Sequence, residues 1–119
     1  MKQTFYITTP IYYANSLPHL GHLYTTTVAD FLTKYKKQRG FETLFLTGTD
    51  EHGVNIQRVA EEKGKTPKEY VDYVSNEYKK MFAQFGLDKY DIFMRTTNRF
   101  HYEGVQNLWR EIAKNTTPK

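Results

Sequence analysis

The chain has 119 residues, a length that suits one small domain with a real core but is short for an enzyme with two substrate pockets. Hydrophobic residues make up 39% and aromatic residues 16%, which excludes intrinsic disorder, and the lack of cysteine excludes disulfides and thiolate metal sites. A net charge of +4 permits a nucleic-acid partner without demanding one. The sequence shows no apolar leader and no long apolar run, so we expect no signal peptide and no membrane span.

The first third of the chain predicts a strand followed by a helix. Thr4–Thr9 is β-branched and aromatic and ends at Pro10, which predicts a strand buried on at least one face. Residues 11–18 are expected to form a loop. From Leu20 onward apolar residues recur at intervals of three and four, which predicts a helix that stops before Gly40; the repeating positions are Val28, Phe31, Leu32 and Tyr35.

The middle of the chain predicts a second strand and two helices. Thr43–Thr47 is apolar enough for a strand covered on both faces, and residues 48–53 are expected to form the loop at its carboxyl end. A helix is predicted from about Val54 to Lys63. The next begins with a capping box, Thr66-Pro67-Lys68-Glu69, and ends at Gly86. Its apolar stripe is expected in the core and consists of Val71, Val74, Tyr78, Met81, Phe82 and Phe85.

A third strand over Asp91–Thr96 and a last helix marked by Val105, Leu108, Trp109 and Ile112 complete the pattern. This alternation predicts an α/β fold, one half of a doubly wound parallel sheet with flanking helices. Ligands of such sheets bind outside the carboxyl ends of the strands. A half sheet is also expected to expose a strand edge and apolar helix faces.

His19 and His22, in the run Pro18-His19-Leu20-Gly21-His22, follow the first strand and open the first helix. A helix N-terminus attracts anions through its unpaired amides and its dipole. Gly21 lets a nucleotide approach the backbone, and the imidazoles supply N–H donors. The motif therefore indicates a polyphosphate site, although two unrelated surface histidines would match it equally well.

The loop after the second strand carries Asp50, Glu51 and His52 at the same predicted edge of the sheet. There Asp50 could hold an ammonium group while the histidines hold phosphates. Alternatively, Asp50 and Glu51 serve as N-cap and first-turn acids of the following helix. A third interpretation is a zinc or iron site built from His19, His22, Asp50 and His52, although Gly21 serves close approach better than it serves ligand geometry.

At these residues the chain closely resembles the methionyl-tRNA synthetases, class I aminoacyl-tRNA synthetases with a Rossmann-type catalytic domain. The resemblance covers nearly the whole chain. It is carried by the stretches Ile7–Asn15, His19–His22, Leu44–Gly53 and Asp91–Thr97, that is, by Ile-Thr-Thr-Pro-Ile-Tyr-Tyr-Ala-Asn, His-Leu-Gly-His, Leu-Phe-Leu-Thr-Gly-Thr-Asp-Glu-His-Gly and Asp-Ile-Phe-Met-Arg-Thr-Thr.

The resemblance implies an ATP-dependent, cytoplasmic ligase that converts methionine to methionyl-adenylate, using Mg²⁺, and transfers the methionyl group to tRNA(Met). His19 and His22 would be the catalytic pair that stabilises the ATP phosphates, and Gly21 would let the adenine lie against the backbone. The methionine would contact Asp50 through its ammonium group and a pocket wall of Pro10, Ile11 and Tyr13. His52 would lie behind these residues as a support.

The resemblance also implies that residues 1–119 are the amino-terminal half of the catalytic, nucleotide-binding domain, with no second domain. The other half of that domain, a connective insertion that could bind zinc, the second ATP loop and an anticodon-binding domain are expected elsewhere in a longer enzyme. No metal site is expected in these residues. The alternative is a fragment or module that binds nucleotide without ligase activity of its own.

Overall fold

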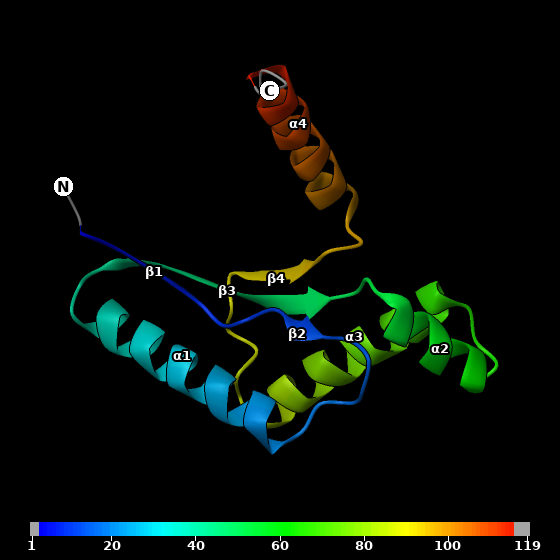
Figure 1. Ribbon diagram of the computed structural model, residues 1–119. Coiled ribbons are helices and arrows are strands. Elements are labelled where there is room, and N and C mark those ends of the chain that lie inside the picture. The colour runs from blue at the N-terminus through cyan, green and yellow to red at the C-terminus, as the bar shows by residue number, and fades with distance from the viewer. Residues whose placement is uncertain (1–2, 116–119) are drawn as a thin grey trace.

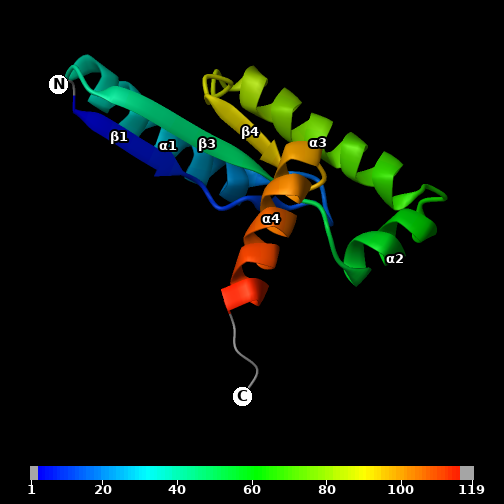
Figure 2. The ribbon, with the colours of Figure 1, turned by 90° about the horizontal axis from the view of Figure 1, so that it is seen from above.

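Strand β3 (Glu42–Asp50) is the centre of a parallel sheet in the computed structural model, which describes residues 3–115. Strands β1 (Thr4–Thr8) and β2 (Tyr12–Tyr13) pair with β3 along one edge, and β4 (Ile92–Arg95) pairs along the other (Figure 2). All these pairings are parallel, so the carboxyl ends of the strands gather at one edge. The prediction of a parallel α/β half sheet is confirmed.

β2 was missed, because residues 11–18 were expected to be a loop throughout. The N–H of Thr9 donates to the carbonyl of Leu46 at 3.1 Å and so continues the ladder beyond β1. Pro10 has no N–H, so the pairing breaks there and resumes where Tyr12 and Tyr13 register with Thr49 and Asp50. One proline thus divides a single extended run into two strands.

The expected loop over residues 48–53 was also partly wrong, since β3 runs on to Asp50. Gly48 is a sheet residue, and a Cβ on it would lie 1.9 Å from the carbonyl oxygen of Met94 on β4. A glycine is therefore required at position 48 because β3 and β4 lie in close contact there, and not because the chain turns. The start of β3 is less covered than expected, because Leu44 is 42% exposed.

Helices α1 (Leu20–Gln38) and α3 (Pro67–Gln84) lie on the same face of the sheet, and α2 (Val54–Glu62) packs against α3 (Figure 1). The capping box at Thr66 and Glu69 is present as predicted. Gly40, Gly64 and Gly86 follow α1, α2 and α3 with positive φ, as expected of helix-ending glycines.

The core lies between α3, α2 and β2; its fully buried large side chains include Ile56, Val71, Val74, Tyr78 and Phe82. Met81 packs against this cluster, but Phe85 is 61% exposed, which contradicts its prediction as a core residue. The reason is that α3 ends at Gln84: Phe85 is the C-cap, and Leu87 turns into the core in its place.

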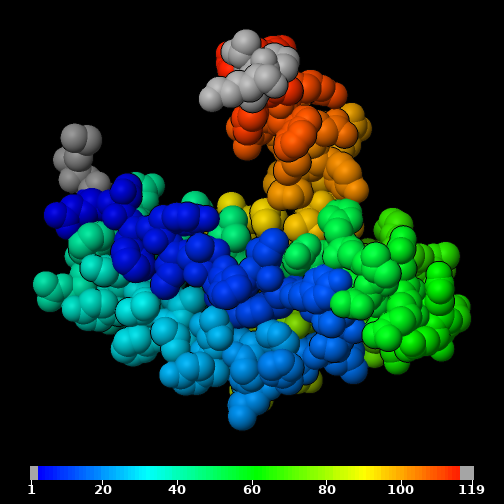
Figure 3. Space-filling view, in the orientation of Figure 1, coloured from blue at the N-terminus to red at the C-terminus, as the bar shows by residue number. Residues whose placement is uncertain are grey.

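The helical repeat in α1 predicted the helix but not its packed face. Val28, Phe31, Leu32 and Tyr35 remain at least 36% exposed, whereas the buried residues of α1 are Thr26, Ala29, Asp30 and Thr33. Helix α4 (Arg99–Asn115) buries none of its residues and stands clear of the rest of the molecule (Figure 3). The expectation of exposed apolar helix faces is confirmed.

Gly48→Ala is expected to lower the free energy of unfolding by about 3 kcal/mol or more, because the new methyl group would force β3 and β4 apart. Urea unfolding followed by circular dichroism measures this. Gly104→Ala is the matched control, since no atom lies within 4 Å of its Cβ position, and it should change stability by less than about 1 kcal/mol. Equal effects of the two substitutions would contradict the assigned role of Gly48.

Candidate functional site

His19 and His22 form the N-terminal cap of α1. The N–H of Gly21 donates to Nδ1 of His19 at 3.1 Å, and the N–H of His19 donates to Nδ1 of His22 at 3.1 Å. This is a capping box in which imidazole nitrogens replace the usual side-chain oxygens. One first-turn amide expected to be free for an anion is therefore occupied by the protein itself.

The capping bonds determine which ring nitrogen carries the proton. An Nδ1 that accepts a backbone N–H must offer a lone pair, so in each neutral ring the proton sits on Nε2. Burial, assisted by the neighbouring His19 ring, lowers the pKa of His22 and favours its neutral form. His19 is exposed, and its Nε2–H has no partner among residues 3–115. In this tautomer each ring carries an Nε2–H, and its use as a donor to a ligand stays a prediction.

Gly21 has an internal role in addition to any contact with a ligand. A Cβ at this position would lie 2.9 Å from Cε1 and 3.1 Å from Nδ1 of His19. A larger residue would therefore push the His19 ring out of its capping position. The predicted close approach of a nucleotide at Gly21 stays a prediction.

β2 connects the histidines to the second predicted loop. The Tyr12 ring meets the His22 ring edge-on, with centroids 4.7 Å apart, and the neighbouring Tyr13 is in register with Asp50. The N–H of Ala14 donates to the carbonyl of Asp50 at 2.8 Å. The two loops therefore meet through one short strand, as the half-sheet prediction requires.

Asp50 ends β3 half-buried, and its carboxylate has no hydrogen bond or ion pair with any other residue of the described chain. The Tyr13 hydroxyl lies against Gly53, where a Cβ would come within 2.5 Å of it and where φ is +130°. Ile11 is half-buried and Pro10 exposed beside β2. This arrangement leaves a free anion next to an aromatic wall.

The interpretation of Asp50 and Glu51 as helix-capping acids is wrong. The N-cap of α2 is Gly53, which forms no side-chain cap, and the first turn of α2 holds no acid. Asp50 belongs to β3, and the side chain of Glu51 is fully buried. The chain stays extended past Asp50, so these acids end before the helix begins.

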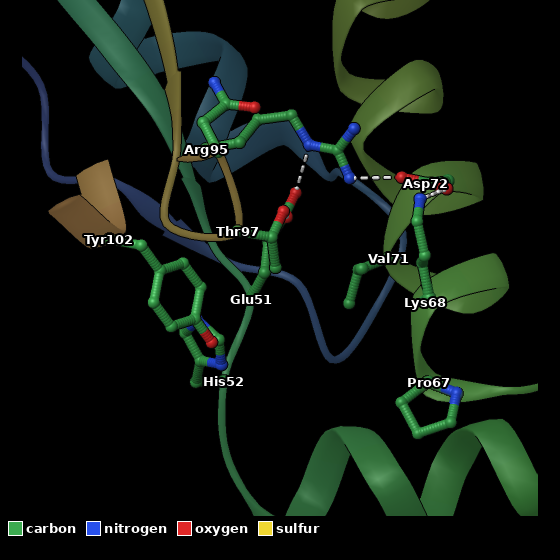
Figure 4. A pocket seen from close by; sticks show the side chains of 10 residues that line it. Glu51, His52, Pro67, Lys68, Val71, Asp72, Arg95, Thr97 and Tyr102 are labelled. Atoms are coloured by element: carbon green, nitrogen blue, oxygen red, sulfur yellow. Dashed lines mark hydrogen bonds and ion pairs between the residues drawn. The ribbon is translucent and has the colours of Figure 1, made fainter. Parts of the chain in front are cut away.

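Glu51 is the residue that sequence reasoning missed. Its Oε1 accepts from Nε of Arg95 at 2.7 Å, from the Ser75 hydroxyl at 2.7 Å and from the Thr49 hydroxyl at 2.8 Å (Figure 4). Thr97 donates to Oε2. These donors come from β3, α3, β4 and the segment after β4, and together they hold the pKa of Glu51 below its ordinary value against the opposing effect of burial.

Arg95 extends this network to α3, because its NH2 group donates to Oδ1 of Asp72 at 2.6 Å. The Lys68 ammonium group donates to the other oxygen of Asp72, also at 2.6 Å. Both donors lower the pKa of Asp72, Lys68 more than Arg95. The only signal in the sequence was a lone arginine at the end of a predicted strand, which does not identify its partners.

A cavity of about 430 Å³ opens over this network, between α3 and the start of α4. His52 and Tyr102 line one side, and Lys68, Asp72 and Arg95 the other. Nε2 of His52 lies 3.4 Å from the carbonyl oxygen of Thr96, and the ring meets Tyr102 edge-on at 5.7 Å. His52 therefore packs against the β4 side, away from the two other histidines of the predicted site.

The interpretation as a metal site is not supported. Within residues 3–115 no group of three or more His, Cys, Asp or Glu side chains is arranged to hold a metal ion. His19 and His22 turn their Nδ1 atoms to backbone N–H groups, and His52 faces β4. In the same range, no helix has both the length and the apolar character needed to cross a bilayer.

A parallel half sheet with a histidine-capped helix after its first strand is the arrangement that the resemblance to the class I synthetases implies. The model of the tRNA synthetases class I (M) matches residues 5–117, so the chain belongs to this family. The chain is 50% identical over 111 residues to the methionine--tRNA ligase of Clostridium tetani, covering 93% of this chain and 17% of that protein. Against the ligase of Thermotoga maritima it is 43% identical over 111 residues, with 93% and 18% covered.

A solved structure gives the same result. The methionyl-tRNA synthetase of Mycobacterium tuberculosis in complex with methionyl-adenylate superposes with a TM-score of 0.90 at 32% identity, covering 94% of this chain and 22% of that one. These findings confirm the family and the Rossmann-type fold. The chain spans less than a fifth of the length of these two ligases.

Glu51→Gln is expected to cost about 3 kcal/mol of stability, because Arg95 would lose a buried carboxylate partner while keeping Asp72. Denaturant unfolding measures this. Glu62→Gln is the control, since Glu62 is exposed and its nearest cation, Arg58, lies 4.0 Å away; it should change stability by less than about 0.5 kcal/mol.

The stability of the chain should also depend on acid pH in a defined direction. The pKa values of Glu51 and Asp72 are lower when folded than when unfolded, so their contribution is complete above the unfolded values and is lost as pH falls through the folded ones. Unfolding midpoints measured from about pH 6 downward should fall, and the fall should be shallower in Glu51→Gln. Parallel curves for the two proteins would contradict this assignment.

Proposed function

We propose that the chain is part of a methionine--tRNA ligase and forms the amino-terminal half of its catalytic domain. In the reaction, a carboxylate oxygen of methionine attacks the α-phosphorus of ATP, forming the acyl–phosphate bond of methionyl-adenylate while pyrophosphate leaves. A ribose hydroxyl at the 3′ end of tRNA(Met) then attacks the carbonyl carbon, and AMP leaves. Such displacements need alignment and charge stabilisation more than covalent catalysis.

The observation that carries this proposal is the pairing of opposite chemistries across β2. On one side His19 and His22 present N–H donors at a helix N-terminus, which suits the phosphates of ATP. On the other side Asp50 offers an unpaired carboxylate, which suits an ammonium group. An amino acid that reacts with a nucleotide supplies both an ammonium group and phosphates.

We assign the remaining predicted residues to the same pocket. Gly21 would lie against the adenine, and Pro10, Ile11 and Tyr13 would form the wall beside the methionine side chain. His52 would support the pocket from the β4 side, where it contacts Thr96 and Tyr102. We assign no residue of the chain to Mg²⁺ and place any Mg²⁺ on the ATP phosphates.

The alternative is that these residues alone bind nucleotide without ligase activity. It is favoured by the chain spanning less than a fifth of the length of its relatives. Methionine-dependent exchange of labelled pyrophosphate into ATP separates the two. Exchange by the 119-residue chain, abolished by His19→Ala, would contradict the alternative. A full-length parent that exchanges with another amino acid and not with methionine would contradict the ligase proposal.

Asp50→Asn in the full-length protein should raise KM for methionine by about 10- to 100-fold while leaving KM for ATP within about twofold, because only the charge-assisted bond to the ammonium group is lost. The pyrophosphate exchange assay measures both constants. Glu62→Gln serves again as the surface control. A rise in KM for ATP in place of KM for methionine would place Asp50 on the other substrate.

A further inference from the structure

Tyr78 on α3 is a fully buried tyrosine whose hydroxyl faces the His22 ring. Its Oη lies 3.2 Å from Nε2 of His22 and 3.4 Å from Nδ1. Among residues 3–115 no other polar group contacts this hydroxyl. The hydroxyl of a buried tyrosine normally has a hydrogen-bond partner. Here the single polar neighbour is a histidine of the candidate site, and this contact requires an explanation.

The ring of Tyr78 is itself held firmly. It stacks on Tyr12 with centroids 5.5 Å apart and an interplanar angle of 7°, and it meets Phe82 edge-on at 6.1 Å. Tyr12 is anchored in turn by a hydrogen bond of 2.9 Å between its hydroxyl and that of Thr26 on α1. The Tyr78 hydroxyl therefore occupies a fixed point beside His22.

The contacts of His22 leave its Nε2–H free. Nδ1 accepts from the N–H of His19, so the proton of the neutral ring is on Nε2. The Tyr78 Oη lies nearly equally far from both ring nitrogens, so it contacts the side of the ring between them, and Nε2–H, which points outward from the ring, is not directed at it. The His22 ring is thus held at Nδ1 and by the Tyr78 hydroxyl, whereas the His19 ring is held at Nδ1 alone.

We propose that Tyr78 is a positioning residue for His22, its fixed hydroxyl holding the His22 ring in the orientation in which Nε2–H meets a phosphate. The role in catalysis rests on the proposed function. A phosphate oxygen can accept from Nε2–H while Tyr78 stays in contact with the ring. The two histidines then differ: the ring of His19 is held by the bond to Nδ1 alone, and the ring of His22 is held by α3 as well.

Tyr78→Phe tests this, because it keeps the ring contacts and removes only the hydroxyl. Proton–nitrogen correlation spectra of the chain labelled with ¹⁵N-histidine report the tautomer of each ring, and His22→Gln identifies the His22 signals. We expect Tyr78→Phe to shift or broaden the His22 signals, because the ring loses the contact that fixes its orientation, while Nδ1 still accepts from the N–H of His19. The His52 and His101 signals should not change.

Tyr70→Phe is the matched control. Tyr70 is also on α3, is 2% exposed and donates one hydrogen bond, of 3.0 Å, to the carbonyl of Asn15. It should lose a similar amount of stability without changing the His22 spectrum. If both substitutions cost the same stability and neither alters His22, Tyr78 is a core residue only and the proposal is overturned.

The catalytic role has a separate test. In the full-length protein, Tyr78→Phe should lower kcat for methionine-dependent pyrophosphate exchange about three- to tenfold, the scale of one hydrogen bond, with KM for methionine unchanged. An unchanged kcat together with a shifted His22 spectrum would overturn the catalytic part. Absence of exchange in the unsubstituted protein would instead overturn the proposed function, since the spectra do not depend on which reaction occurs.

Discussion

The buried carboxylate of Glu51 is the constraint on which the carboxyl end of the sheet depends. Removing a charge from water is unfavourable unless donors replace the lost hydration, and here Arg95 and hydroxyl groups of Thr49, Ser75 and Thr97 replace it. Because these donors belong to separate elements, satisfying one carboxylate fixes the end of β3 against both β4 and α3. The backbone N–H of Glu51 adds a bond of 2.9 Å to the Thr96 hydroxyl.

This anchoring determines what its neighbours can do. Thr49 and Glu51 both reach Ser75 on α3, so in an extended chain the side chain between them points the other way. Asp50 is therefore left without a partner beside Tyr13, while its backbone is held by Ala14. The bonds of the buried Glu51 carboxylate thus hold the unpaired carboxylate of Asp50 in a defined place.

At the histidine pair, structure and proposed function use different nitrogens of the same rings. Both Nδ1 atoms stabilise the start of α1, and this leaves both Nε2–H groups as donors of known position. Sequence reasoning recognised donors at a helix N-terminus but assigned the amides to the ligand. Nδ1 of His19 accepts from the Gly21 amide, and the ring fits there because glycine has no side chain. The spacing of residues in the sequence does not predict this contact.

The sequence by itself determined the helices, where they begin and end, and the alternation of strands and helices that makes a parallel sheet, because periodicity, capping boxes and helix-ending glycines are local signals. It also pointed to the two segments that carry the candidate site, although it took them for loops throughout. Only the tertiary structure decided that Gly48 serves strand contact, that Pro10 separates β1 from β2, and that α1 packs through small residues. It also decided that Glu51 is buried and paired with Arg95, whereas the carboxylate of Asp50, its neighbour in sequence, has no partner among the described residues. The physical reason is that a charged or polar side chain takes its role from partners supplied by distant segments, and the sequence does not say which segments will meet.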